Sequence, residues 1–121
     1  MVKLIFCLTR RPELTEEEFH RIWRDEHAPL VRSHAEALGI RRYVQSHTAH
    51  PSLNAALAAT RDAPIHYDGV AELWFDSVDA LAAAVASPEG TAAGEALLED
   101  ERRFIDHPLS PIFLVEEHTV I

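Results

Sequence analysis

The hydrophobic pattern constrains the fold of this chain most. Stretches with the two-residue period of a strand and stretches with the period of a helix follow one another in a definite order. Apolar residues alternate with other residues from Val2 to Thr9, which predicts a half-buried β-strand. Thr15 then predicts a helix N-cap, because Glu18 stands three residues later, as a capping box requires. This helix is expected to run to about Leu38 and to end at Gly39. The chain is therefore predicted to open with a strand followed directly by a helix.

The rest of the chain completes a regular pattern. Further strands are predicted at about 40–47, 69–75 and 109–121, and helices at 78–86 and 91–104, with a short helix at 53–60. Apart from the short helix, the order is strand, helix, strand, strand, helix, strand, which is the split βαβ arrangement of a ferredoxin-like α+β sandwich. No linker or low-complexity segment interrupts the 121 residues, so residues 1–121 are predicted to form a single domain.

Composition excludes several classes of protein. The net charge of −9 disfavours binding to nucleic acid or to an anionic membrane surface, both of which are negatively charged. No apolar stretch approaches the roughly 20 residues that a membrane-spanning helix needs. The single cysteine, Cys7, cannot form an internal disulfide, and the N-terminus lacks a signal-peptide pattern. We therefore expect a cytoplasmic protein with neither nucleic acid nor a membrane as its partner.

One face of the first predicted helix carries aromatic, histidine and leucine side chains at helical spacing: Phe19, Trp23, His27, Leu30 and His34. Burying an imidazole without a partner costs roughly 1–3 kcal/mol, so this face is predicted to border a polar group or a ligand cavity. Pro29 cannot donate a backbone hydrogen bond to Asp25, and a kink is expected just after His27. His27 is either an acid–base group or a half-buried histidine bonded to a backbone carbonyl, and the spacing leaves both hypotheses open.

The histidine spacing also bears on metal binding. His20, His27 and His34 recur every seven residues. Seven residues span about 10 Å along a helix, so two of these side chains cannot bind one ion. We predict no metal site, and a site that combines His27 with residues distant in sequence is the remaining alternative.

The second predicted strand has an unusually polar face. Arg41, Tyr43, Gln45 and His47 share that face by the two-residue period of a strand. Such a face borders solvent, a pocket or a partner subunit. Tyr43 and His47 could orient a carbonyl or phenolic substrate, whereas Arg41 and Gln45 fit a polar dimer interface at least as well.

A few other residues are candidates for a site. Asp106 could hold His27 or His107 in one tautomer, as carboxylates do for catalytic imidazoles, although an aspartate that ends a helix is the commoner explanation. Trp74 and Phe75 point to opposite faces of their strand, so one of them is expected to wall the cavity or an interface. Cys7 is interpreted as a packing residue. An acidic run is interpreted as a solvated helix face: Glu95, Glu99, Asp100 and Glu101.

Several segments taken together resemble the EthD family: Phe6 to Pro12, Thr15 to Phe19, Trp23 to Val31, Tyr43 to His47, Tyr67 to Ser77 and Phe104 to Asp106. The resemblance spans essentially the whole chain. It implies a homodimer in which two ferredoxin-like sheets close face to face into a dimeric α+β barrel. Relatives occur with ether-degrading cytochrome P450 systems, and fungal members act as dehydratases or decarboxylases in aromatic polyketide pathways.

The resemblance also implies roles for particular residues. His27, Tyr43 and Arg41 match positions that contact the ligand in neighbouring families of this fold. We therefore expect a cofactor-independent dehydratase, isomerase or decarboxylase that acts on a small oxygenated metabolite, including aromatic or polyketide-like ones. His27 would serve as base or acid, Tyr43 would polarise a substrate oxygen, and Asp106 or His47 would orient the imidazole. The expected substrate-binding residues are Phe6, Trp23, Arg41, His47 and Trp74.

Two alternatives belong to other functional classes. The chain could be a non-catalytic accessory protein that serves a cytochrome P450 degradation system. It could also be an oxidoreductase or monooxygenase, since related barrels include haem-binding proteins and cofactor-free monooxygenases. We favour the cofactor-free lyase or isomerase, because an imidazole and a phenol on facing elements suit acid–base chemistry near neutral pH.

Overall fold

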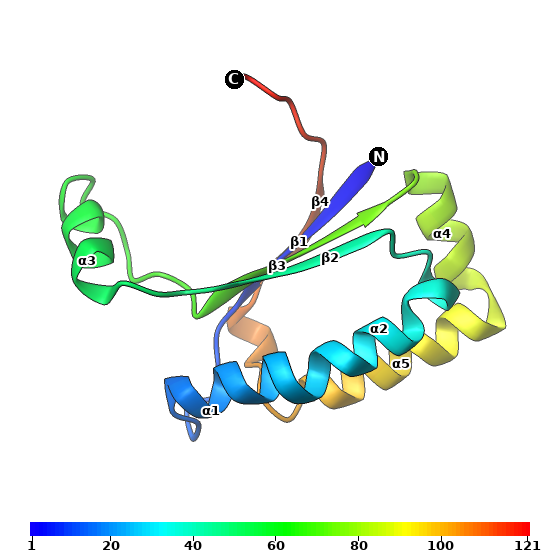
Figure 1. Cartoon of the computed structure of the whole chain (residues 1–121), viewed down its shortest axis with the longest axis horizontal. Coiled ribbons are helices and arrows are strands. Elements are labelled where there is room, and N and C mark those ends of the chain that lie inside the picture. Colours follow the sequence, from blue (N-terminus) through cyan, green and yellow to red (C-terminus); the bar gives the residue numbers. More distant parts are fainter.

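The computed structural model describes all residues, Met1–Ile121, and consists of a four-stranded sheet with a layer of helices on one face (Figure 1). The strands are β1 (Val2–Leu8), β2 (Arg42–His47), β3 (Gly69–Phe75) and β4 (Ile112–Val115). They lie in the order β2-β3-β1-β4, and every neighbouring pair is antiparallel. This topology confirms the predicted ferredoxin-like α+β fold.

The first helix forms three consecutive segments: α1 (Glu16–Arg21), a π-helical segment η1 (Ile22–His27) and α2 (Ala28–Leu38). The predicted capping box is present, because the backbone N–H of Glu18 donates to the Thr15 hydroxyl at 3.1 Å and the Glu18 carboxylate accepts from the backbone N–H of Thr15 at 3.0 Å. Gly39 ends α2 with a φ of 71°. The irregularity expected near Pro29 takes the form of the π-helical turn, which ends at His27. Such turns are frequent at functional sites.

The remaining elements are α3 (Pro51–Ala59), α4 (Val78–Ala86), α5 (Pro88–Glu101) and a short 3-10 helix, η2 (His107–Leu109). Helix α4 has the predicted bounds, whereas α5 begins at Pro88 rather than at Thr91. The reason is that the Ser87 hydroxyl caps α5 by accepting from Gly90, and a proline is well placed in a first helical turn. Strand β4 is much shorter than the predicted 109–121, because it pairs with β1 only from Lys3 to Phe6.

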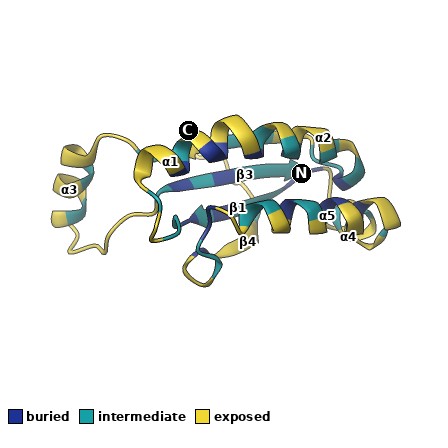
Figure 2. Cartoon of the chain, turned by 90° about the horizontal axis from the view of Figure 1, so that it is seen from below, coloured by how far each residue is buried: buried dark blue, intermediate teal, exposed yellow.

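The helix layer covers one face of the sheet and leaves the other uncovered (Figures 1 and 2). The main core lies between the helices and the sheet and contains Phe6, Leu8, Phe19, Ile22, Trp23, Ala71, Phe104 and Ile105. The uncovered face carries apolar side chains, among them half-buried Ile5, Val44 and Val70. Helix α3 has no buried residue and projects from one end of the sheet (Figure 1). No helix has the length and apolar composition that crossing a membrane would need.

A close approach between Trp23 and β3 fixes the position of the π-helical segment on the sheet. A Cβ atom added at Gly69 would lie 2.8 Å from Cη2 of Trp23 and 2.9 Å from the backbone oxygen of Ser46. Both separations are shorter than real Cβ contacts, so only glycine fits here. Gly69, at the start of the third predicted strand, therefore supplies the space in which the indole ring lies.

Candidate functional site

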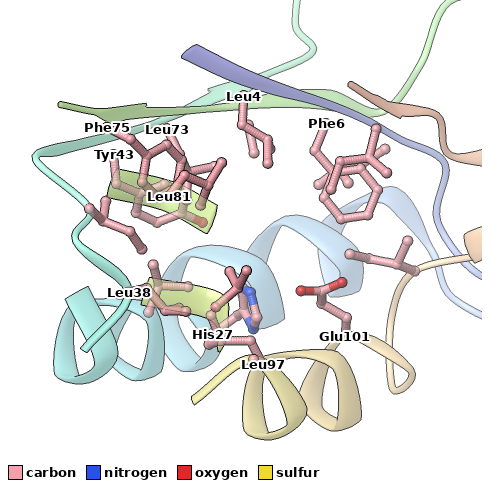
Figure 3. Close-up of a pocket in the computed structure, with 18 of the residues that line it drawn as sticks. Leu4, Phe6, His27, Leu38, Tyr43, Leu73, Phe75, Leu81, Leu97 and Glu101 are labelled. Atoms are coloured by element: carbon pink, nitrogen blue, oxygen red, sulfur yellow. The ribbon is translucent and has the colours of Figure 1, made fainter. Parts of the chain in front are cut away.

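A cavity of about 250 Å³ lies between the sheet and the helix layer. Hydrophobic residues make up 16 of the 19 that line it. Apart from the indole of Trp23, three side chains bring polar atoms to this lining: His27, Tyr43 and Glu101 (Figure 3). An apolar pocket with a few convergent polar groups is the usual form of a small-molecule site. The cavity is therefore the candidate functional site of this protein.

A carboxylate on α5 holds the imidazole of His27. The Nδ1 atom of His27 lies 2.7 Å from Oδ2 of Asp100, and the His27 side chain is only 6% exposed. A carboxylate accepts but does not donate hydrogen bonds, so Nδ1 carries the proton in this pair. The ring of Phe104 meets the imidazole edge-on, with centroids 5.1 Å apart. These contacts fix both the tautomer and the orientation of the His27 ring.

The Asp100 carboxylate is itself held by a charged neighbour. The guanidinium of Arg103 lies 2.8 Å from Oδ1 of Asp100, and it also donates to Glu26 at 3.1 Å. Asp100 thus accepts from His27 with one oxygen and from Arg103 with the other. The Arg103 contact therefore fixes the position of the carboxylate that holds the imidazole.

The second nitrogen of His27 remains available to a ligand. Since Nδ1 faces the carboxylate and carries a proton, the neutral form of the ring has its lone pair on Nε2. Nε2 makes no hydrogen bond to the protein, yet no side-chain nitrogen or oxygen is buried without a partner. Nε2 therefore reaches the open space of the cavity that His27 lines (Figure 3). An Asp–His pair with a free Nε2 has the arrangement of a general base.

Tyr43 brings a hydroxyl group to the cavity from β2. Its oxygen accepts a hydrogen bond from the side-chain amide of Gln45 at 2.8 Å. Burial raises the pKa of the Tyr43 hydroxyl, while the amide of Gln45 and the nearby indole of Trp23 act to lower it. The phenol is therefore neutral near pH 7 and can donate a hydrogen bond to a ligand oxygen.

Glu101 is the third polar group, and it lies at the C-terminal end of α5. Figure 3 shows its carboxylate pointing into the space between helices and sheet. Nε2 of His107 lies 3.1 Å from Oε1 of Glu101. The cavity thus contains an imidazole, a phenol and a carboxylate on three different elements.

Four of the predicted site residues line this cavity: Phe6, Trp23, His27 and Tyr43. Of the pair Trp74 and Phe75, the structure places Phe75 at the cavity. Trp74 lies on the uncovered face, where its indole donates to Glu117 at 2.6 Å and the guanidinium of Arg42 lies 4.7 Å from its ring centroid. Trp74 therefore does not line this cavity, because the strand period directs it to the other side of the sheet.

Arg41 and His47 also lie outside the cavity lining. Strand β2 begins only at Arg42, and the Arg41 guanidinium reaches the end of the sheet, where it pairs with Asp76 at 2.7 Å. The His47 ring packs against the Trp23 ring with centroids 4.3 Å apart and bonds to Gln45 and His20 instead of to His27. Neither residue brings its side chain to the cavity lining.

Asp106 does not orient an imidazole. It follows α5, and its backbone N–H donates to the Thr9 carbonyl at 2.9 Å. The two histidines that were predicted to contact Asp106 contact other carboxylates: His27 contacts Asp100, and His107 contacts Glu101. The contact expected of Asp106 is thus made by Asp100, six residues earlier.

Asp100 and Glu101 were missed because the acidic run was interpreted as a solvated face. The structure leaves each of their side chains only 17% exposed. The signal was present in the spacing: Ala93, Leu97 and Phe104 are buried on one face of the C-terminal helical region, and Asp100 falls at helical spacing between the last two. A carboxylate in an apolar stripe indicates a buried partner in the same way as His27 does.

The described residues contain no group of three or more histidine, cysteine, aspartate or glutamate side chains placed to hold a metal ion. His20 and His47 come closest, because their Nδ1 atoms lie 2.7 Å apart. That separation is a hydrogen bond between the two rings, and it leaves no room for an ion between the nitrogens.

Comparison with solved structures places this geometry among known folds. An EthD family protein from Bacillus halodurans matches with 25% identity and a TM-score of 0.63, over 98% of this chain and 99% of that one. SnoaB, a cofactor-independent oxygenase from Streptomyces nogalater, matches with 16% identity and a TM-score of 0.56, over 99% and 95% of the two chains. HapK from Hahella chejuensis matches with 10% identity and a TM-score of 0.60, over 99% and 95%. A comparison with curated protein sequences finds no match.

The fold and the cavity define a ferredoxin-like α+β domain with a largely apolar internal site. The family model of the EthD domain matches residues 11–108. The chain therefore belongs to the EthD family, as the sequence motifs indicated.

Proposed function

We propose that this protein is a cofactor-independent enzyme that performs acid–base chemistry on a small oxygenated compound, including aromatic or polyketide-like metabolites. The observation that carries the proposal is the hydrogen bond between Asp100 and His27, which leaves Nε2 of the imidazole free at an apolar cavity. An Asp–His pair with a purely structural role does not need an imidazole nitrogen without a hydrogen-bond partner. A general base does need such a nitrogen.

The chemistry follows from the positions of His27 and Tyr43. Nε2 of His27 takes a proton from a carbon next to a carbonyl group, and Asp100 stabilises the imidazolium that forms. The Tyr43 hydroxyl donates a hydrogen bond to the carbonyl oxygen, on which negative charge develops. Return of the proton to another carbon isomerises the compound. Transfer of the proton to a departing β-hydroxyl group instead releases water, which is a dehydration.

Similarity to SnoaB supports a second candidate function for the same cavity, which is cofactor-free oxygenation. A cofactor-free oxygenase also begins by removing a proton, since the resulting carbanion is what reacts with molecular oxygen. The EthD resemblance also keeps open a ligand-binding role without turnover. The cavity supports all three functions to different degrees, because its apolar lining favours binding and its Asp–His pair favours proton removal.

The test uses the purified wild-type protein with a chelator and no added cofactor. A panel of β-hydroxy ketones, β-keto acids and hydroxylated aromatic ketones is incubated in D₂O, and mass spectrometry detects deuterium uptake and loss of water or CO₂. We expect deuterium at the carbon next to the carbonyl, because His27 exchanges that proton with solvent. Oxygen uptake would instead favour the oxygenase, and tight binding measured by calorimetry without any exchange would favour the accessory role.

We further propose that two copies of the chain pair through the uncovered face of the sheet. The face of an antiparallel sheet that borders water usually carries polar residues. Here the face carries Ile5, Val44, Val70 and Phe113, the last of which is 47% exposed. A second copy is the occupant that the EthD resemblance implies.

Light scattering of the purified protein measures this association directly. We expect a mass of twice 13.6 kDa, and we expect Val70→Asp to give the monomer mass because a buried unpaired charge opposes pairing. Ser33→Asp adds the same charge at an exposed position of α2, in the helix layer and away from the uncovered face, and should leave pairing unchanged. A monomeric wild-type protein would contradict the proposal.

A further inference from the structure

A chain of hydrogen bonds connects the cavity to a pair of histidines that do not line it. Gln45 contacts the Tyr43 hydroxyl and the Trp23 backbone oxygen with Nε2, at 2.8 and 2.9 Å. Its other amide atom, Oε1, lies 2.8 Å from Nε2 of His47. The Nδ1 atom of His47 then lies 2.7 Å from Nδ1 of His20. Four side chains on α1 and β2 therefore form one continuous network that ends at the cavity.

The Trp23 carbonyl determines the direction of every bond in this network. A backbone oxygen can only accept a hydrogen bond, so the atom of Gln45 that faces it must be the NH₂ group. That NH₂ group uses one hydrogen for Trp23 and the other for Tyr43. The Oε1 atom of Gln45 must therefore accept from His47, which places a proton on Nε2 of His47.

The histidine pair continues the same direction. Burial, His20 and Arg24 lower the pKa of His47 from 6.5 to about 4, so its ring is neutral at neutral pH. With the proton on Nε2, the Nδ1 atom of His47 accepts, and His20 donates to it. This holds whether His20 is neutral or charged, because its Nδ1 carries a proton in both cases.

The π-helical turn keeps the Trp23 carbonyl available. The backbone N–H of Ala28 donates to this oxygen from five residues ahead, which is the wide spacing of a π-helix. The carbonyl has a second lone pair and uses it for Gln45. The irregular segment of the first helix thus provides the fixed point from which the network takes its direction.

We propose that His20, His47 and Gln45 are positioning residues that hold the Tyr43 hydroxyl as a hydrogen-bond donor to the cavity, which therefore takes a ligand with a carbonyl or phenolate oxygen at its β2 end. Tyr43 accepts from Gln45, so its own hydrogen cannot point there and is free for a ligand. This inference deepens the proposed function and rests on it, because it names the chemical group that the site recognises. It also gives His20 and His47 a use that does not require contact with the ligand.

The test compares two probes of nearly equal size, 1-tetralone and tetralin, which differ by one carbonyl oxygen. Calorimetry measures affinity, and infrared difference spectroscopy measures the carbonyl stretch of bound 1-tetralone. The wild-type protein is expected to bind the ketone about fivefold more tightly than the hydrocarbon, and to shift its carbonyl stretch to lower wavenumber. Tyr43→Phe should lose both effects and bind tetralin as before.

Two substitutions of Gln45 test the direction of the network. Gln45→Glu keeps the size of the side chain but replaces the donating NH₂ by an acceptor, so the Tyr43 hydroxyl turns toward the new carboxylate. The carbonyl shift should then disappear although Tyr43 is present, whereas Gln45→Met should only weaken it because nothing recaptures the hydroxyl. An unchanged shift in the Gln45→Glu protein would overturn the inference.

The outcomes separate this inference from the proposed function. If both probes bind and the ketone has no advantage, the donor role of Tyr43 is wrong and the acid–base proposal for His27 stands. If neither probe binds to the wild-type protein, the cavity is not a small-molecule site and both proposals fail. Circular dichroism of each variant, together with its affinity for tetralin, shows whether the fold has changed.

Discussion

His27→Ala is expected to lower kcat by about 10²–10⁴-fold, which is the usual contribution of a general acid–base group. The free Nε2 of His27 is the only imidazole nitrogen placed to take a proton in the cavity, and alanine cannot replace it. The protein is expected to stay folded, because Arg103 still neutralises Asp100 once the imidazole is gone. The turnover found in the substrate panel provides the measurement.

The matched control for this variant is His118→Ala. His118 is exposed near the C-terminus and makes no contact with the cavity. The substitution makes the same change from histidine to alanine at an exposed position away from the cavity. It is therefore expected to leave kcat and the melting temperature unchanged. Wild-type turnover in the His27→Ala protein would show that the imidazole only holds the ligand, and the acid–base proposal would have to be abandoned.

Asp100→Asn is expected to lower kcat by a similar factor, about 10²–10⁴-fold, with little change in KM. Asparagine has nearly the same shape, but its NH₂ group can donate to Nδ1 of His27 and so move the proton of the neutral ring to Nε2. That tautomer has no lone pair facing the cavity, which is the reason that such a change is severe in a serine protease. Single-turnover rates and binding measured separately would distinguish the two effects.

Glu99→Gln provides the control, because it removes the same charge from the neighbouring position. The Glu99 side chain is 76% exposed and pairs with Arg102 on the surface of α5. Its loss should change stability by less than about 1 kcal/mol and leave turnover as it was. If the Asp100→Asn protein keeps full activity while Glu99→Gln behaves as expected, the tautomer of His27 does not matter and the Asp–His pair has only a structural role.

The elements that could be predicted from sequence are those in which a local signal and the packing agree. The capping box at Thr15, the glycine after Leu38 and the bounds of α4 follow from neighbouring residues alone. The strand order follows from the sequence of elements, since few topologies accommodate it. Strand β4 was predicted too long because a strand ends where its partner ends, and that partner lies more than a hundred residues away.

The candidate site was predicted only in part, for the same reason. His27 could be found because it lies on the apolar stripe of its helix, and Tyr43 because it matches a ligand-contacting position in neighbouring families of this fold. The carboxylate that holds His27 could not be chosen from sequence, since several acidic residues near the end of α5 have the right chemistry. The choice between Asp106 and Asp100 depends on the rotation of α5 against η1, which packing determines.

The sequence by itself determined the ferredoxin-like fold, the EthD family and the inward position of one histidine. Periodicity, caps and motifs each depend on residues that are close together in the sequence. Only the tertiary structure decided which groups meet: Asp100 with His27, Gln45 with the Trp23 carbonyl, and His47 with His20 instead of the cavity. Each of these contacts joins elements that are 22 or more residues apart. Whether such a hydrogen bond forms depends on distances of tenths of an ångström, which no spacing in the chain encodes.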